Sequence, residues 1–450
     1  STQKQLWILS QFEGGSLAYN IPVALKIKGN IVIDKLEESF RLLIERHEIL
    51  RSSFNINEDG IVEQFVLDKK AIHCTIEKVD FTQESNLEAK VLNYIDTKSN
   101  EVFDLQTGVL IKNSLIKIKD NEYILFFSMH HIIGDGRSLE IIVKDILHFY
   151  KMLIDNTKSD VEDLKIQFKD FVFWKNSNQD EYIRAKQYWL EKFSGTLPVL
   201  NIENSKKRPL IKSFNGSKKE LQFSQEFTTE LKEYSKAHEV TLFMTLLCGI
   251  NVLLYTYSEQ HDIIIGTPLA GRDHPDLENL VGLFLNIIPI RTIMQGNNTF
   301  YDLLKDQKNN LLTSFEHQNY PLTDLIDALQ LKKDNSRAPL FDVMMSLNLA
   351  NKNLGYEGFD AFEIEAFEFK RKASQFDLNF VFNQFDNLEL TLEYNTDIFE
   401  EFEIERLFND FEKMMKKIFK NSNLPIKEFK KSNQEIKKRN LNKLSNLLKK

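Results

Sequence analysis

A chain of 450 residues with 58 basic and 66 acidic side chains carries a formal net charge of −8, and 42% of its residues are hydrophobic. This length suggests two or three domains at roughly 100–200 residues each, and the apolar content can form a sizeable core. A nucleic-acid-binding protein usually has the opposite charge balance or a concentrated basic face, so that class is disfavoured. No stretch approaches about 18 uncharged apolar residues and no signal peptide opens the chain, so we expect no membrane attachment.

The cysteine content indicates a reducing compartment. Cys74 and Cys248 are the only cysteines and lie far apart, which argues against a disulfide scaffold and excludes a zinc cluster built on cysteines. We therefore expect a cytoplasmic protein. The lysine-rich end, residues 426–450, is interpreted as a basic linker or tail. The chain starts at Ser1 without a methionine, so we expect it to be a piece of a longer polypeptide.

The first part of the chain alternates strands and helices. Residues 17–29, 61–68 and 73–80 read as strands, and residues 34–48 have apolar residues at helical spacing. Residues 109–129 read as a hairpin whose two apolar runs flank the sequence KDNE. Residues 138–154 form an amphipathic pattern typical of a helix. The sequence thus predicts a buried strand that leads into a helix.

A second block of similar content follows. Residues 168–193 and 228–258 are predicted helices, and residues 194–219, rich in Ser, Gly, Pro and Lys, are the best candidate for a connection between lobes. Later strands are predicted at 262–268, 340–350, 376–385 and 388–395, with helices at 301–317 and 400–419. We expect two α/β blocks.

The stretch SMHHIIGDGRS, residues 128–138, joins the predicted strand to the predicted helix. Neighbouring side chains of an extended segment point to opposite faces, so His130 and His131 cannot easily share one metal ion, and we expect no metal. Gly134 and Gly136 suit a sharp turn, and Asp135 suits an ion pair or an imidazole partner. From these residues alone, a structural turn and a catalytic site both remain open.

Several common enzyme signatures are absent from the sequence. It contains no P-loop, no GxGxxG fingerprint and no GxSxG nucleophile elbow. Without a nucleophile motif, direct acyl transfer is favoured over a covalent acyl-enzyme.

Residues 129–138, MHHIIGDGRS, resemble the HHxxxDG core motif of nonribosomal peptide synthetase condensation domains. Other stretches resemble further blocks of that family in the family's order: STQKQLW (1–7), YNIP (19–22), RHEILRSSF (46–54), FKDFVFW (168–174), GTPLAGR (266–272), VGLFLNIIPIR (281–291), HQNYPLTDLI (317–326) and KDNSRAPLFDVM (333–344). The resemblance covers roughly residues 1 to 400.

The resemblance implies an α/β fold of two chloramphenicol-acetyltransferase-like lobes, a V-shaped pseudo-dimer with a tunnel at the interface. We expect lobes at 1–175 and 176–425. The implied reaction is amide bond formation between an upstream carrier-bound acyl or peptidyl thioester and the amine of a downstream carrier-bound aminoacyl thioester. No cofactor is expected on the domain itself, because phosphopantetheine arms of carrier proteins present the substrates. Neighbouring adenylation or polyketide synthase modules are implied partners, and the excised domain is expected to be monomeric.

The resemblance also implies roles for individual residues. His131 faces the tunnel and removes the amine proton or orients the amine, whereas His130 supports the turn from the core side. Asp135 pairs with an arginine, for which Arg272 is the first candidate and Arg291 the second. The Gly136 N–H, at a predicted helix N-terminus, is a candidate oxyanion donor. Gly282 and Asn286 belong to the block around the tunnel floor.

One departure bears on the acceptor. Arg137 stands where many family members carry Trp, so it is a candidate modulator on the acceptor side. The opening blocks resemble the subtype that takes an L-configured donor, and a starter subtype with an acyl donor remains open. The alternatives are a noncatalytic docking or recruitment module of the same fold and a freestanding acyltransferase that uses coenzyme A thioesters.

Overall fold

The computed structural model describes residues 2–11, 17–71, 75–108, 110–158, 161–349, 362–369 and 372–429. The chain divides into two compact units, and both are discontinuous. Unit 1 draws on Ser1–Ile183, Leu269–Asn286 and Asn351–Arg371, and unit 2 draws on Arg184–Pro268, Ile287–Ala350 and Lys372–Lys450. The first change of unit lies near the expected boundary at 175, but two later segments return to unit 1. The expected second lobe, 176–425, is therefore not one continuous block.

Unit 1 is built on a five-stranded sheet in the order β11-β1-β6-β5-β4. Its strands are β1 (Asn20–Gly29), β4 (Glu77–Asp80), β5 (Ile111–Lys119), β6 (Glu122–His130) and β11 (Phe362–Ala366). β5 and β6 form the predicted antiparallel hairpin, and Asn121 supplies the positive φ of 58° in its turn. A separate two-stranded sheet pairs β2 (Ser52–Ile56) with β3 (Val62–Val66).

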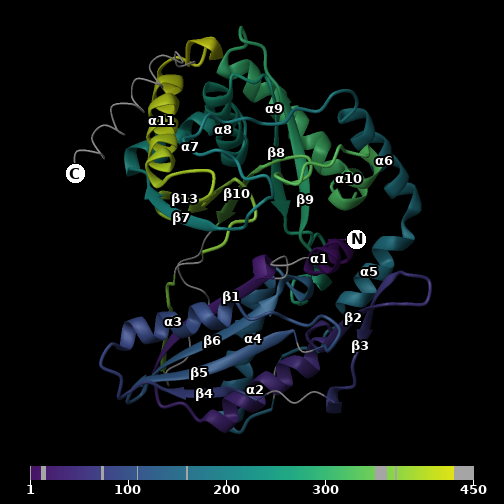
Figure 1. Ribbon diagram of the computed structural model, residues 1–450, viewed down its shortest axis with the longest axis vertical. Coiled ribbons are helices and arrows are strands. Elements are labelled where there is room, and N and C mark those ends of the chain that lie inside the picture. The colour runs from purple at the N-terminus through teal and green to yellow at the C-terminus, as the bar shows by residue number, and fades with distance from the viewer. Residues whose placement is uncertain are drawn as a thin grey trace. The chain divides into compact units, whose positions relative to one another are not determined.

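Helices lie on both faces of the five-stranded sheet (Figure 1), and alternate residues of the central strands pack against different helices. Leu125 and Phe127 of β6 pack in one apolar cluster with α2 (Ile33–Arg46) and α4 (Gly136–Asp155). Ile124 and Phe126 point to the opposite face and pack with α3 (Leu87–Ser99). This period-2 alternation buries both faces of the strand that leads to the histidines.

Unit 1 also contains α1 (Thr2–Ser10) and α5 (Phe168–Ser177). Among the described residues, the short 3-10 helices outside the histidine segment are η1 (Leu17–Tyr19), η2 (Glu48–Arg51), η3 (Lys69–Ala71), η5 (Pro275–Leu277) and, in unit 2, η6 (Ile426–Phe429). Beyond η6, the predicted basic tail lies outside the described residues.

Unit 2 is built on a six-stranded sheet in the order β7-β13-β12-β10-β8-β9. The strands are β7 (Gly216–Gln222), β8 (Asp262–Leu269), β9 (Asn286–Ile293), β10 (Val343–Leu349), β12 (Leu378–Gln384) and β13 (Leu388–Asn395). The helices are α6 (Gln179–Lys192), α7 (Gln225–Ala237), α8 (Leu242–Ser258), α9 (Phe300–Glu316), α10 (Leu322–Leu329) and α11 (Glu401–Lys420). α11 packs on α7 and α8, and α8 packs on α9 (Figure 1).

Two predicted helices are each divided in two. The helix expected at 228–258 ends at Ala237, because Glu239 has a left-handed φ of 53° and the Thr241 hydroxyl caps a new helix by accepting a hydrogen bond from the Met244 N–H. The helix expected at 168–193 is interrupted at Asn178, between α5 and α6. In the first case, a left-handed residue and a capping hydroxyl overrode the helical spacing of the apolar residues.

Cys248 is a buried free thiol on α8, and Cys74 lies outside the described residues. Within the described chain, no individual helix has both the length and the apolar composition that crossing a bilayer requires. Taken together, α7 and α8 have that length and composition, but they are bent by 106° relative to each other.

Candidate functional site

The two histidines lie where β6 ends. His130 is the last residue of β6, His131 opens the 3-10 helix η4 (His131–Ile133), and α4 begins at Gly136. We refer to residues 130–138 as the histidine turn. The predicted junction of a buried strand with a helix is therefore present, with the motif at the junction.

His130 is a core residue held in its neutral form. Its side chain is fully buried, and its Nδ1 accepts a hydrogen bond of 3.2 Å from the Ile132 N–H. Since Nδ1 is an acceptor, the proton of the neutral ring is on Nε2. Burial, followed by the charge of neighbouring His131, lowers the pKa of His130 to about 3. The ring meets Phe103 edge-on, with 6.3 Å between centroids, so His130 supports the turn from inside.

His131 is only partly buried, unlike His130. Its carbonyl oxygen accepts a hydrogen bond of 3.3 Å from the Gly134 N–H, which closes η4. The side chain of Gln3 in α1 donates a 3.0 Å hydrogen bond to the Ile132 carbonyl and so braces the same turn. Gln3 did not emerge from the sequence, because no local pattern links residues 129 positions apart.

Asp135 is the ionic centre of the histidine turn. Its Oδ2 lies 2.8 Å from Arg272 Nη1, and its Oδ1 lies 3.1 Å from Arg272 Nη2. Both side chains are about 95% or more buried, and the Arg272 guanidinium lies 4.2 Å from the centroid of the Phe284 ring. The Phe284 N–H donates to Oδ2 at 3.1 Å, and the Ser138 N–H donates to Oδ1 at 2.9 Å, which makes Asp135 the N-cap of α4. A carboxylate with this many donors is a fixed structural anion and has no lone pair left for a substrate proton.

The glycines of the turn differ in what surrounds them. A Cβ on Gly134 would lie 2.7 Å from Met129 Cε and 3.1 Å from Ser138 Cβ, so a side chain there would force the Met129 side chain to shift. The backbone of Gly134 is extended, with φ of −173°, so the sharp turn expected from the sequence does not explain why glycine stands at this position. Gly136 is exposed, and a Cβ on it would meet nothing within 4 Å. As the first residue of α4, Gly136 has an N–H without an acceptor inside the helix.

The remaining predicted residues lie in three different settings. Gly282 faces the turn through its backbone, which contacts the Ser138 hydroxyl, and a Cβ there would lie 2.1 Å from the Phe168 ring. Arg137 is exposed and pairs with Glu140 one turn along α4. Asn286 is buried at the start of β9.

Arg291, the second candidate partner for Asp135, has a different partner. It pairs with Asp262 in unit 2, with 2.7 Å between Nη2 and Oδ2, and donates to the carbonyls of Lys192 and Ser194. It is a structural residue of unit 2.

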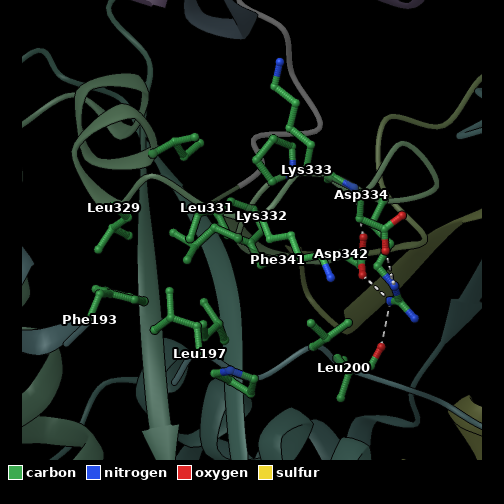
Figure 2. Close-up of a pocket in the computed structure, with 18 of the residues that line it drawn as sticks. Phe193, Leu197, Leu200, Leu329, Leu331, Lys332, Lys333, Asp334, Phe341 and Asp342 are labelled. Atoms are coloured by element: carbon green, nitrogen blue, oxygen red, sulfur yellow. Dashed lines mark hydrogen bonds and ion pairs between the residues drawn. The ribbon is translucent and has the colours of Figure 1, made fainter. Parts of the chain in front are cut away.

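In the described part of the chain, no group of three or more His, Cys, Asp or Glu side chains is placed to hold a metal ion. Unit 2 has a cavity of about 740 Å³ between the 193–200 segment, β8, the end of α10 and the 331–342 loop. Figure 2 shows apolar side chains, among them Phe193, Leu197 and Leu329, on one side of it and an ionic group around Asp342 on the other. None of the predicted site residues lines this cavity.

Comparisons with known proteins agree on the family. The family model described as "Condensation domain" matches residues 1–440. The chain is 33% identical over 446 residues to gramicidin S synthase 2 of Aneurinibacillus migulanus, covering 98% of this chain and 10% of that protein. It is 36% identical over 425 residues to bacitracin synthase 3 of Bacillus licheniformis, covering 93% of this chain and 6% of that protein. The chain thus spans a tenth or less of the length of these relatives.

Solved structures agree on the fold. The X-domain from teicoplanin biosynthesis superposes with a TM-score of 0.85 at 21% identity, over 94% of this chain and 95% of that one. The first condensation domain of the calcium-dependent antibiotic synthetase, in complex with a substrate analogue, gives a TM-score of 0.75 at 16% identity, over 95% and 97%. The predicted mixed α/β, chloramphenicol-acetyltransferase-like fold is confirmed. The chain, with both histidines and the aspartate of its HHxxxDG motif in place, belongs to the condensation-domain family of nonribosomal peptide synthetases.

Proposed function

We propose that this chain is an acyltransferase that forms an amide bond between a carrier-bound acyl or peptidyl thioester and the amine of a carrier-bound aminoacyl thioester. The observation that carries the proposal is the histidine turn of a condensation-domain chain, in which His131 is partly exposed while the residues around it are locked. The turn offers one side chain for chemistry on a rigid support.

The reaction makes modest demands on a base. The α-amino group of the acceptor has a pKa of roughly 7.7–8, so about a sixth of it is neutral near pH 7. When the amine attacks the thioester carbonyl, the carbonyl oxygen becomes an oxyanion, and the thiolate then leaves with the C–S electron pair. The larger tasks are to hold two tethered reactants in attack geometry and to stabilise that oxyanion.

Each residue of the turn fits one of these tasks. The imidazole of His131 either removes the amine proton or accepts a hydrogen bond that orients the amine. The Gly136 N–H is the first of a helix of 20 residues, where it has no acceptor inside the helix, and it can donate to the oxyanion. Asp135 is excluded as the base because its oxygens accept from Arg272, Ser138 and Phe284. Its role is to fix the turn.

The partners follow from the reaction. Phosphopantetheine arms of an upstream and a downstream carrier protein present the two thioesters, and adenylation or polyketide synthase modules flank the domain. Support comes from the relatives, in which the matching region is 6–10% of a much longer synthetase. That context makes a freestanding acyltransferase that uses coenzyme A a poorer explanation. Because the sequence has two cysteines far apart, we expect the reaction to take place in the reducing cytoplasm.

A second candidate is a noncatalytic recruitment module. It is favoured by one observation: an X-domain, also solved in complex with OxyB, superposes with TM-scores of 0.85–0.86. That likeness concerns the fold alone, at 21% identity.

The two candidates are separated by single-turnover condensation with a loaded donor carrier and a loaded acceptor carrier. We expect dipeptidyl or acyl-aminoacyl product from the wild-type chain. If His131 acts as a general base, His131→Ala lowers the rate by about 10²–10⁴-fold. His274→Ala is the matched control, because His274 is exposed in the same unit and pairs only with Asp276 at the surface. An undiminished rate for His131→Ala contradicts the assignment, and no product from any loaded pair favours the recruitment module.

A further inference from the structure

We propose that Ser138 is a positioning residue of the histidine turn, and that its hydroxyl sets where the turn lies against residues 269–286. The proposal rests on the function proposed above, because the turn carries His131 and the Gly136 N–H. Ser138 is fully buried and does not face a substrate. Four hydrogen-bonding groups of three residues, Asp135, Arg272 and Gly282, meet its Oγ.

The hydrogen bonds use the whole capacity of this hydroxyl. Oγ accepts from the Gly282 N–H at 3.1 Å and from Arg272 Nη2 at 3.0 Å. Its own proton has two acceptors within reach, Asp135 Oδ1 at 2.8 Å and the Gly282 carbonyl at 2.9 Å. A hydroxyl has one proton and two lone pairs, so every bonding position is occupied and the proton is shared between the carboxylate and the peptide.

The docking follows a regular pattern along the returning segment. Residues 269–286 belong to unit 1 but are flanked in sequence by unit 2 residues on both sides. Within the segment, the Leu280 carbonyl accepts from Arg272 Nη2, Gly282 uses both of its backbone groups on Ser138, and the Phe284 N–H donates to Asp135. The three contacts fall on alternate residues, as expected for an extended backbone that presents one edge to the turn.

The Ser138 hydroxyl makes the central one of these three contacts, and the neighbouring backbone cannot easily move to replace it. A Cβ on Gly282 would lie 2.1 Å from the Phe168 ring, so the backbone of Gly282 has no room to shift toward α5. Without the hydroxyl, the Gly282 N–H and carbonyl would be buried without these partners. The Asp135 carboxylate would then have to connect α4 to residues 269–286 without the Ser138 Oγ that now bonds to both.

The consequence for catalysis comes through α4. Ser138 is the third residue of α4, two positions after Gly136, and both its N–H and its hydroxyl bind the same oxygen of the N-cap Asp135. Loss of the hydroxyl therefore changes the first turn of the helix that presents the Gly136 N–H. Because this N–H matters most when the oxyanion forms, we expect the effect on kcat rather than on KM.

The experiment compares Ser138→Ala with Ser39→Ala in the full chain. Ser39 is a matched control because it is equally buried in the same unit, and its hydroxyl donates only to the Lys35 carbonyl within α2. The measurements are kcat and KM with loaded carriers, the melting temperature, and amide hydrogen exchange of Gly282. Ser138→Thr, which keeps the hydroxyl, is the rescue variant. If Ser138→Ala is insoluble, Ser138→Cys replaces it, since a thiol gives only weak hydrogen bonds.

We expect Ser138→Ala to lower kcat by at least about tenfold, the value of one or two buried hydrogen bonds, with little change in KM. Exchange of the Gly282 amide should become about tenfold faster, and Ser39→Ala should change neither quantity. Ser138→Thr should recover most of kcat. A kcat for Ser138→Ala equal to that of Ser39→Ala overturns the proposal, as does an unchanged Gly282 exchange rate. If the wild-type chain makes no product, the proposed function fails, while the exchange of Gly282 still decides whether Ser138 holds the segment.

Discussion

Each unit contains a buried Arg–Asp pair, and the two pairs connect different kinds of segments. In unit 1, Arg272 and Asp135 are 137 residues apart and join a returning segment to the N-terminus of α4. In unit 2, Arg337 and Asp342 are 5 residues apart, 2.5 Å between Nη1 and Oδ2, and close a loop beside the cavity in Figure 2. Asp135 is next to a motif that carries chemistry, whereas Asp342 is next to none of the predicted site residues.

The difference lies in what each arginine keeps when its aspartate is removed. Arg337 has a second carboxylate, Asp334, whose Oδ2 lies 3.8 Å from its Nε. Besides Asp342, Arg337 donates to the Leu200 carbonyl and to the Asn201 side chain. Besides Asp135, Arg272 has the Ser138 hydroxyl, the Leu280 carbonyl and the face of Phe284, all within the same network. Arg337 thus keeps a counter-ion when Asp342 is lost, whereas the partners that Arg272 keeps are neutral and belong to the network that Asp135 holds together. Two Arg–Asp pairs of similar burial can therefore differ in how much stability is lost when the aspartate is removed.

The largest expected effect comes from removing each carboxylate. We expect Asp135→Ala to lower the free energy of unfolding by about 3–5 kcal/mol, because it leaves the Arg272 charge buried without a counter-ion. Asp342→Ala should cost less, about 1–3 kcal/mol, since Arg337 keeps Asp334 as a counter-ion. Urea unfolding of both variants measures the difference.

The kcat of the same two variants distinguishes them further. The folded fraction of Asp342→Ala should keep the wild-type kcat, while Asp135→Ala should lose kcat as well as stability. A stable but inactive Asp135→Ala would instead indicate that the carboxylate takes part directly in the chemistry.

The next effect comes from breaking the long-range docking without touching a charge. Gly282→Ala places a Cβ 2.1 Å from Phe168, and overpacking of this kind costs about 1–3 kcal/mol. Gly136→Ala is the control within the same site, because its Cβ meets nothing within 4 Å. Relative to glycine, alanine in a helix gains about 0.5–1 kcal/mol at most, so Gly136→Ala should melt at or slightly above the wild-type temperature. Equal melting temperatures for both variants would contradict the tight contact at Gly282.

A smaller effect comes from pH, through the buried histidine of the turn. His130 stays neutral in the folded chain because its pKa is lowered to about 3, whereas the unfolded histidine titrates near its ordinary value of about 6.5. The unfolded state therefore binds the extra proton between these values, so this contribution to stability is complete above about pH 6.5 and is lost as the pH falls toward 3, at up to roughly 1.4 kcal/mol per pH unit.

The test is the slope of unfolding free energy between pH 6.5 and 5, above the range of ordinary carboxylates. His130→Asn keeps an acceptor for the Ile132 N–H and does not titrate, so it should reduce the slope. Some slope should persist, since burial also lowers the pKa of His47, against the hydrogen bond to Asp145 that raises it. A slope identical to wild type would show that His130 is protonated in the folded state.

The parts of the fold that follow local patterns could be predicted from the sequence. The hairpin of β5 and β6 and the start of α4 follow from apolar periodicity around a turn, and the resemblance pointed to Arg272 as the partner of Asp135. The division of residues 228–258 into two helices could not be foreseen from apolar periodicity, because it depends on the left-handed backbone of one residue, Glu239.

The parts that depend on distant contacts could not be predicted. Nothing in the order of the residues shows that 269–286 returns to unit 1, and therefore nothing shows that Ser138 meets Gly282. A weak signal for Ser138 exists in its place three residues after Asp135, the spacing of an N-cap and the N–H that it accepts. That signal identifies the cap but not the hydroxyl's second role, because the partners come from 144 residues away.

The smallest expected effect on stability comes from an exposed ion pair, Arg137 with Glu140. Its side chains are 53% exposed, and a surface pair of this type contributes about 0–1 kcal/mol. Arg137→Ala should therefore leave the melting temperature close to wild type, as should Arg41→Ala, which removes an equivalent exposed pair from α2. Because Arg137 directly follows Gly136 on the exposed first turn of α4, we expect Arg137→Ala alone to change KM for the acceptor carrier while KM for the donor stays constant. An unchanged KM for both carriers would make Arg137 one more solvated charge on the helix, and the departure from Trp at this position would then have no bearing on acceptor choice.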